Sequence, residues 1–295
     1  MQEEVKHKAG FVNIFGPPNV GKSTLLNALI GEQLAIVSPK VQTTRHRIQG
    51  FLSGDNYQII FSDTPGIIEP KYQLHHQMMK HVKGAIEDTD VAIFMADVNT
   101  DPEEFGEIVK QLNIKTKTIL LLNKIDLIKK KKEVKVFLKE FEEQVKTDYI
   151  FPLSVKKEKG IKELLELIVT LLPESPAFFP KDDISDRNMR FFVSELIREQ
   201  IYFLYDQEIP YHTAVLIQTY EEEEHIVRIS ADIIVTRETQ KIIFLGKKGS
   251  KIKELGIESR KKIEEFIGRQ VYLELFVKVR PKWRDNQTHL REYGY

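Results

Sequence analysis

Gly16-Pro17-Pro18-Asn19-Val20-Gly21-Lys22-Ser23 is a complete G-x-x-x-x-G-K-[ST] phosphate loop. It follows an apolar run at residues 11–15 that predicts a strand, and it precedes a helical run at residues 24–30. The glycines allow successive backbone N–H groups to point at a polyphosphate, while Lys22 can bridge terminal phosphates and Ser23 can offer an oxygen to Mg2+. The stretch therefore predicts a nucleotide-binding α/β domain.

The residues that select the base follow a second buried strand, predicted at residues 118–122. Asn123, Lys124 and Asp126 form an N-K-x-D pattern, in which Lys124 can lie along the base plane. The Asp126 carboxylate can accept hydrogen bonds from the N1–H and 2-amino groups of guanine, whereas adenine has no 2-amino donor. The pattern therefore predicts GTP and GDP as ligands. A strand predicted at 149–153 leads to three residues placed to offer a backbone N–H to guanine O6: Ser154, Val155 and Lys156.

A nucleotide switch is predicted where the strand at residues 57–62 ends in Asp63-Thr64-Pro65-Gly66. The D-x-x-G spacing places Asp63 near Mg2+, which it would hold through water, and places Gly66 where its N–H can turn toward a third phosphate. In the polar stretch at residues 42–45, Thr44 is the favoured hydroxyl to complete the Mg2+ shell in the triphosphate state, with Thr43 as the alternative. We expect Lys22, Thr44 and Gly66 to be the catalytic residues, and Ser23, Thr44 and Asp63 to hold the metal.

GPPNVGKS, QTTRHR, DTPG and NKID together resemble the G motifs of the Ras-like GTPase superfamily, and most closely its bacterial Era branch. The resemblance implies GTP hydrolysis with Mg2+. The superfamily often has a water-positioning glutamine directly after the D-x-x-G glycine, but this chain has Ile67 there. Because a hydrophobic side chain cannot orient water, we expect slow intrinsic turnover. Related loops use an asparagine at the place of Asn19 to help bind K+, so K+ is a second candidate cofactor.

The chain of 295 residues is longer than one typical domain. Apolar strands alternate with amphipathic helices up to residue 172, which is typical of a mostly parallel sheet with helices on both faces. Three prolines in residues 173–180 then favour an extended connector. We therefore predict a GTPase domain at 1–172, a linker at 173–180 and a second domain at 181–295.

Charge is balanced overall, with 44 basic and 44 acidic residues, but it is unevenly distributed. Residues 181–224 hold 4 basic and 11 acidic side chains, and residues 241–291 hold 14 basic and 6 acidic ones. This asymmetry predicts a basic surface for a polyanion. The absence of cysteine excludes disulfides and thiol catalysis, and no stretch reaches the roughly 18 apolar residues of a membrane-spanning helix. We expect a cytoplasmic protein.

The second domain is expected to contain a helix at 188–204, strands at 213–220 and 226–235, an apolar run at 242–245, a basic helix at 250–267 and a last strand at 271–279. The G-x-x-G at residues 246–249 and this order of elements resemble the type II K-homology (KH) RNA-binding fold, a smaller α+β domain. Glycines let the loop approach a sugar-phosphate chain, and lysines neutralise phosphate. Trp283 is left as either a base-stacking residue or a core anchor. The candidate RNA contacts are Ile243, Leu245, Gly246, Lys247, Lys248, Gly249, Ser250, Lys251, Ile252, Arg280 and Lys282.

The resemblance implies a GTPase switch that binds single-stranded RNA, the 3′ end of 16S rRNA, during assembly of the small (30S) ribosomal subunit. We expect a monomer. One alternative is an rRNA-tethering protein whose GTPase domain is a slow timer with negligible catalysis. Another, supported by the family alone, is a signalling GTPase associated peripherally with the inner membrane. Single-turnover hydrolysis with and without RNA separates the first two.

Overall fold

The computed structural model describes residues 6–295, with the side chains of residues 131 and 132 excepted, so the first five residues of the expected GTPase domain lie outside it. The chain divides into two compact units. Of the described residues, the first unit comprises 6–35, 44–69 and 78–186, and the second comprises 36–43, 70–77 and 187–295. Among the described residues, none of the helices combines the length and apolar character needed to cross a membrane.

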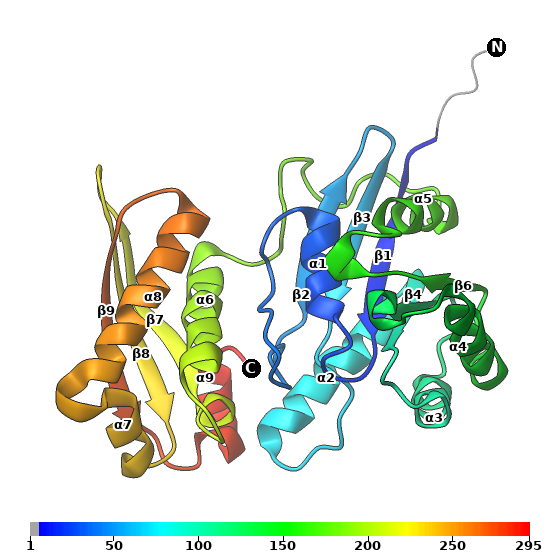
Figure 1. Ribbon diagram of the computed structural model, residues 1–295. Coiled ribbons are helices and arrows are strands. Elements are labelled where there is room, and N and C mark those ends of the chain that lie inside the picture. The colour runs from blue at the N-terminus through cyan, green and yellow to red at the C-terminus, as the bar shows by residue number, and fades with distance from the viewer. Residues whose placement is uncertain (1–5) are drawn as a thin grey trace. The chain divides into compact units, whose positions relative to one another are not determined.

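The first unit is built on a six-stranded sheet with the order β2-β3-β1-β4-β5-β6 (Figure 1). All neighbouring strands are parallel except β2 and β3, which are antiparallel. β4 is buried along its whole length, as expected of a strand covered on both faces. The strands are β1 (Lys8–Phe15), β2 (Ile48–Ser53), β3 (Tyr57–Asp63), β4 (Val91–Asp97), β5 (Lys117–Asn123) and β6 (Tyr149–Pro152).

Helices cover both faces of this sheet. Val82, Phe105 and Phe141 bring α2, α3 and α4 into one hydrophobic cluster with strand residues of β1, β4 and β5. α1 and α5 pack together elsewhere on the sheet, and α1 also contacts β2 and β3. These helices are α1 (Lys22–Ile30), α2 (Gln73–Glu87), α3 (Pro102–Leu112), α4 (Lys131–Gln144) and α5 (Ile161–Leu171). The predicted mostly parallel sheet with helices on both faces is confirmed.

The proline-rich segment does not leave the first unit. The Phe179 ring stacks on Phe51 of β2 with centroids 4.0 Å apart, and Phe51 N–H donates to Ile184 O at 2.9 Å. Ser185 forms a bridge with Gly50 of the same strand. The segment therefore lies along the open edge of β2, and the compact unit extends to Asp186. Prolines that prevent a helix are compatible with this extended course.

The second unit contains a three-stranded sheet, order β7-β8-β9, in which β7 and β8 are antiparallel and β8 and β9 are parallel. Side chains of α6 and α8 share its hydrophobic core, where Ile197, Ile201, Leu255 and Ile263 are buried. The apolar run at 242–245 forms the end of a helix. The elements are α6 (Met189–Leu204), β7 (Ala214–Glu222), β8 (Val227–Val235), α7 (Glu238–Leu245), α8 (Ser250–Ile267), β9 (Val271–Val279) and α9 (Gln287–Glu292).

Candidate functional site: a nucleotide pocket and a basic glycine loop

The phosphate loop joins the carboxyl end of β1 to α1, where helix and strand termini of an α/β sheet form an anion site. Gly16 has φ +155°, and a Cβ there would lie 2.2 Å from Met95 O, so the loop passes too close to β4 for any other residue. The buried Lys22 side chain donates to Gly16 O at 3.1 Å and to Pro17 O at 2.8 Å. The lysine is thus held inside the loop that it serves.

Three oxygens meet beside Lys22. Ser23 Oγ donates to Asp63 Oδ2 at 2.6 Å, and Thr44 Oγ1 donates to the same oxygen at 2.9 Å and lies 2.9 Å from Ser23 Oγ. Among the described residues, none donates a hydrogen bond to the buried Asp63 Oδ1. Two hydroxyls and an unsatisfied carboxylate oxygen form a hard-oxygen set that suits Mg2+. Of the two candidate threonines, Thr44 lies in this group.

Burial changes the acidity of both charged groups in this pocket. It lowers the pKa of Lys22 to about 8, against the opposing effect of the Asp63 carboxylate. It raises the pKa of Asp63, and this rise is opposed by Lys22, Ser23 and Thr44. The charged forms of both side chains therefore lose solvation at this site, which favours the binding of further charges that compensate them.

Hydrogen bonds connect the residues expected to recognise the base with the phosphate loop. Asn123 Nδ2 donates to Val20 O at 2.8 Å, and Asn123 Oδ1 accepts from Val155 N–H at 3.1 Å. Ser154 Oγ donates to Asp126 Oδ1 at 2.5 Å. The Val155 N–H is thus donated to Asn123, and the Lys156 side chain next to it is exposed.

Two other predicted residues have structural contacts. The Thr64 hydroxyl donates to Ile14 O at 2.7 Å and is fully buried. Ile67 packs against the hydrophobic cluster under α2 and α3. These contacts place both side chains against the protein interior, and the expectation that Ile67 does not orient water stays a prediction. Pro65 and Gly66 lie between them, and a Cβ on Gly66 would come within 2.9 Å of Pro18 of the phosphate loop.

Sequence reasoning missed Asp97, at the carboxyl end of β4. Its Oδ2 lies 2.5 Å from Lys124 Nζ, and its Oδ1 accepts from Asn99 N–H at 2.9 Å. Lys124 also donates to Asn19 O at 2.7 Å. The carboxylate therefore fixes the lysine expected along the base plane. The available signal was an acidic residue ending an apolar run at the edge where the other loops gather.

The GKKG loop, residues 246–249, connects α7 to α8 in the second unit. Gly246 has φ 66° and ψ −178°, and a Cβ there would lie 2.8 Å from Lys251 Cγ and 3.0 Å from Lys251 N. Lys247 and Lys248 are exposed, and Gly249 has φ 78° with open space around it. Ser250 starts the 18-residue α8. The loop thus presents two lysines before a helix N-terminus.

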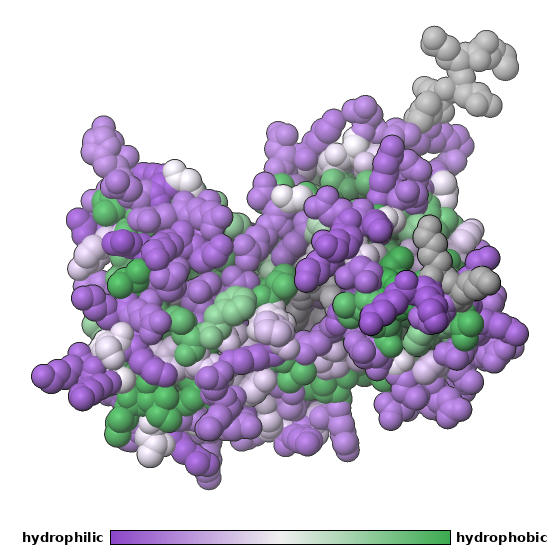
Figure 2. All heavy atoms as spheres, viewed as in Figure 1, coloured by the Kyte–Doolittle hydropathy of each residue, from purple (hydrophilic) through white to green (hydrophobic). Residues whose placement is uncertain are grey.

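Apolar side chains are exposed next to this loop. Ile242 is 68% exposed, Ile243 47% and Leu245 37%, and Figure 2 shows a hydrophobic area over α7. Ile252 instead packs against the hydrophobic core. Exposed aliphatic groups beside a basic loop suit a ligand with apolar faces and a charged backbone, as single-stranded RNA has.

The basic segment after β9 is divided between surface and core. Arg280 and Lys282 are exposed, and Lys251 Nζ lies 5.5 Å from the centroid of the Tyr205 ring. Trp283 is fully buried and donates from Nε1 to His212 O at 3.1 Å. Of its two proposed roles, the core anchor is therefore the one that the structure supports.

Comparison with known proteins finds a family match in each of the two compact units. A family described as 50S ribosome-binding GTPase matches residues 11–124, and a KH-domain family matches residues 208–284. The chain is 41% identical over 295 residues to a GTPase Era from Geobacter sp. (strain M21), covering 99% of each chain.

Two solved structures are similar over almost the whole chain. One is Era in complex with MgGDPNP and nucleotides 1506–1542 of 16S ribosomal RNA, with a TM-score of 0.93, 39% identity and coverage of 98% of this chain and 99% of that chain. The other is a variant of Era from Aquifex aeolicus bound to GDP·AlF4−, with a TM-score of 0.89, 40% identity and the same coverage.

Proposed function

This chain belongs to the Era family of GTPases, and from that membership we propose that it uses Mg2+ and GTP to regulate how a KH domain holds the 3′ end of 16S rRNA. The observation that carries the proposal is the meeting of the Ser23, Thr44 and Asp63 oxygens beside the buried Lys22. A hydroxyl from the loop after α1 contributes to this group, so the site joins the phosphate loop to a segment that can respond to the nucleotide.

In this proposal Ser23 and Thr44 hold Mg2+ directly and Asp63 holds it through water. When it is bound, the ion would neutralise negative charge on the phosphate oxygens. Lys22 adds positive charge to the same phosphates, and the Gly66 N–H turns toward the third phosphate. Thr44 is preferred to Thr43 because its hydroxyl is within hydrogen-bond distance of both Ser23 and Asp63.

Guanine is read at the other end of the pocket. Asp126 accepts from the N1–H and 2-amino groups, Lys124 covers the base plane, and the Lys156 N–H meets O6. The Asp97 and Asn19 contacts support this position of Lys124. Ile67 has no group that can orient the attacking water, so intrinsic turnover is slow in this proposal. Other groups must position the water, and we propose K+ near Asn19 as one of them.

The RNA part of the proposal rests on the GKKG loop and on the relative crystallised with nucleotides 1506–1542 of 16S rRNA. Lys247, Lys248, Lys251, Arg280 and Lys282 would neutralise phosphates, while Ile243 and Leu245 would contact bases. The corresponding role is assembly of the 30S subunit by a monomer in the cytoplasm.

Single-turnover hydrolysis tests the coupling. The full-length protein, preloaded with Mg-GTP, is mixed with an RNA of nucleotides 1506–1542 or with a scrambled RNA of equal length. We expect the matched RNA alone to change the hydrolysis rate, and the Lys22→Ala variant to show none with either RNA. Tight RNA binding with an unaltered and negligible rate would instead support the slow-timer alternative.

A further inference from the structure

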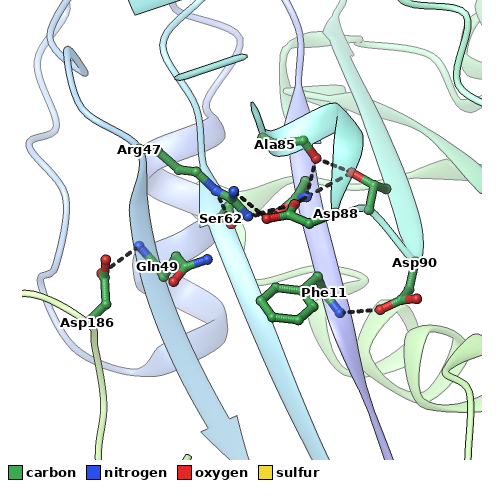
Figure 3. Close-up of polar contacts among 10 residues, drawn as sticks. Phe11, Arg47, Gln49, Ser62, Ala85, Asp88, Asp90 and Asp186 are labelled. Carbon is green, nitrogen blue, oxygen red and sulfur yellow. Dashed lines mark hydrogen bonds and ion pairs between the residues drawn. The ribbon is translucent and has the colours of Figure 1, made fainter. Parts of the chain in front are cut away.

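Arg47 makes a polar connection across one face of the first unit's sheet (Figure 3). It lies directly before β2, and its Nε donates to Ser62 Oγ on β3 at 3.0 Å. Its two terminal nitrogens donate to the two oxygens of Asp88, at 2.6 Å and 2.9 Å. Asp88 directly follows α2. A bidentate arginine–carboxylate pair of this kind is directional as well as strong.

A buried asparagine fixes the far side of this pair. Asn13 Oδ1 on β1 accepts from Arg47 at 3.3 Å, and Asn13 Nδ2 donates to Asp88 Oδ1 at 2.9 Å. The same amide donates to Ala85 O at 2.6 Å and lies 2.8 Å from Thr89 Oγ1. Asn13 and Ser62 are fully buried, and the Arg47 side chain is 15% exposed. The Asp88 side chain is 39% exposed, so the arginine side of the pair is shielded by the fold while the carboxylate still faces water.

The connection joins the ends of the two segments that carry the nucleotide switch. Thr44, which is grouped with Ser23 and Asp63, lies three residues before Arg47. Asp88 directly follows α2, the helix that comes after the D-x-x-G segment. β2 pairs with β3 so that Ile48 lies opposite Asp63. Arg47 is therefore anchored next to the strand end that carries the metal-site carboxylate.

We propose that Arg47 and Asp88 are positioning residues that hold Thr44 at the metal site and so favour GTP over GDP. The inference rests on the role of Thr44 proposed above. The Arg47–Asp88 pair, called the clamp below, restrains the segment after Thr44. This restraint limits the conformations in which the Thr44 hydroxyl moves away from Ser23 and Asp63. GTP complexes use that hydroxyl and GDP complexes do not, so loosening the clamp weakens the first class of complex selectively.

The test compares Arg47→Gln, Asp88→Asn and the double variant in the full-length protein. Kd values for GDPNP and for GDP are measured in the presence of Mg2+. Each single variant is expected to lower the preference for GDPNP over GDP by about fivefold or more, the lower range of typical coupling between sites. The double variant should lose less than the sum of the two singles, because both substitutions break the same Arg47–Asp88 pair.

Two further variants keep the result interpretable. Lys117→Ala breaks the Lys117–Asp148 ion pair, 3.3 Å long, at the start of β5 and should leave the preference unchanged. Thr44→Ala should lower the preference by at least as much as the clamp variants. A merely structural role for Arg47 would reduce the melting temperature and weaken both nucleotides equally.

Two results would overturn the proposal in distinguishable ways. If Thr44→Ala lowers the preference while Arg47→Gln and Asp88→Asn do not, or if the two single effects add in the double variant, the clamp is wrong and the metal site stands. If Thr44→Ala itself leaves the preference unchanged, the assignment of Thr44 is wrong and the clamp falls with it.

Discussion

The nucleotide loops and the GKKG loop both use glycines and lysines, but they hold their lysines differently. Lys22 is buried against carbonyls of its own loop, and Lys124 is held between Asn19 O and the Asp97 carboxylate. Lys247 and Lys248 are exposed, and within residues 6–295 neither forms an ion pair. The lysines of the nucleotide site are fixed by contacts within the protein, so this site is an assembled set of partners, whereas the GKKG loop presents charge to solvent.

This difference predicts different costs for losing one residue. In the assembled nucleotide site, removing one partner leaves other buried polar groups unsatisfied. A single substitution should therefore cause a large loss of nucleotide affinity. At the exposed GKKG loop, each lysine contributes by neutralising phosphate and releasing counterions. A single substitution should therefore cause a small loss of RNA affinity that depends on salt concentration.

The largest effect is expected from Lys22→Ala. The change removes the buried charge beside Asp63, and Mg-GTP affinity should fall by about a hundredfold, equivalent to about 3 kcal/mol for charged hydrogen bonds. Binding of the 1506–1542 RNA by the same full-length variant serves as the control and should remain near that of the unaltered protein. Retained GTP affinity, measured by nucleotide titration, would contradict the assembled-site account.

Asp126→Asn should change which base is accepted. An amide offers a donor to the 2-carbonyl of xanthine, where guanine has an amine, so preference should shift from GTP toward XTP by about tenfold or more, the worth of one charged hydrogen bond. Competition binding with the two nucleotides measures the shift. A variant that keeps full GTP affinity and gains none for XTP would show that another residue reads the base.

Within the GKKG loop, Gly246→Ala should weaken RNA binding more than Gly249→Ala. The backbone of Gly246 is in a region that L-residues avoid and its Cβ would meet Lys251, so strain of about 1–3 kcal/mol is expected there. A Cβ at Gly249 would face open space, so the strain of an alanine there is limited to that of the left-handed backbone conformation, about 1 kcal/mol. Fluorescence anisotropy with the same RNA gives both affinities, and equal losses would remove the distinction.

The smallest effect on affinity is expected from Lys247→Ala combined with Lys248→Ala. Each lost phosphate contact on a single strand lowers the salt slope by about 0.7, so the double variant should lower it by about 1.4 while base preference survives. Titrations over a salt series measure the slope. If it stayed unchanged, the two lysines would be a solvated turn and RNA would enter elsewhere.

Local motifs explain what the sequence could predict. The phosphate loop, Asp63, Asn123 and Asp126 lie in short contiguous patterns whose spacing reflects one turn and one ligand. The basic helix at 250–267 and the strand at 271–279 were predicted with the bounds observed, because glycines flank the helix and apolar residues occupy every second position from 271 to 279.

Partners brought together by the sheet could not be read in the same way. Asp97 meets Lys124 and Arg47 meets Asp88 because neighbouring strands bring distant segments together, and no local spacing encodes those pairs. The choice between Thr43 and Thr44 likewise depended on where the loop returns to Ser23. Trp283 has a basic neighbourhood in sequence but a buried place in the fold.

The segment along β2 also determines where the chain can be cut. β2 is an edge strand, and Phe51 N–H, Gly50 and Gln49 are paired with residues 184–186. A GTPase-domain fragment that stops at residue 172 would expose these backbone groups and the stacked face of Phe51, which is the kind of edge that recruits a strand from another molecule. Such a fragment should self-associate, and one that ends at residue 186 should stay monodisperse.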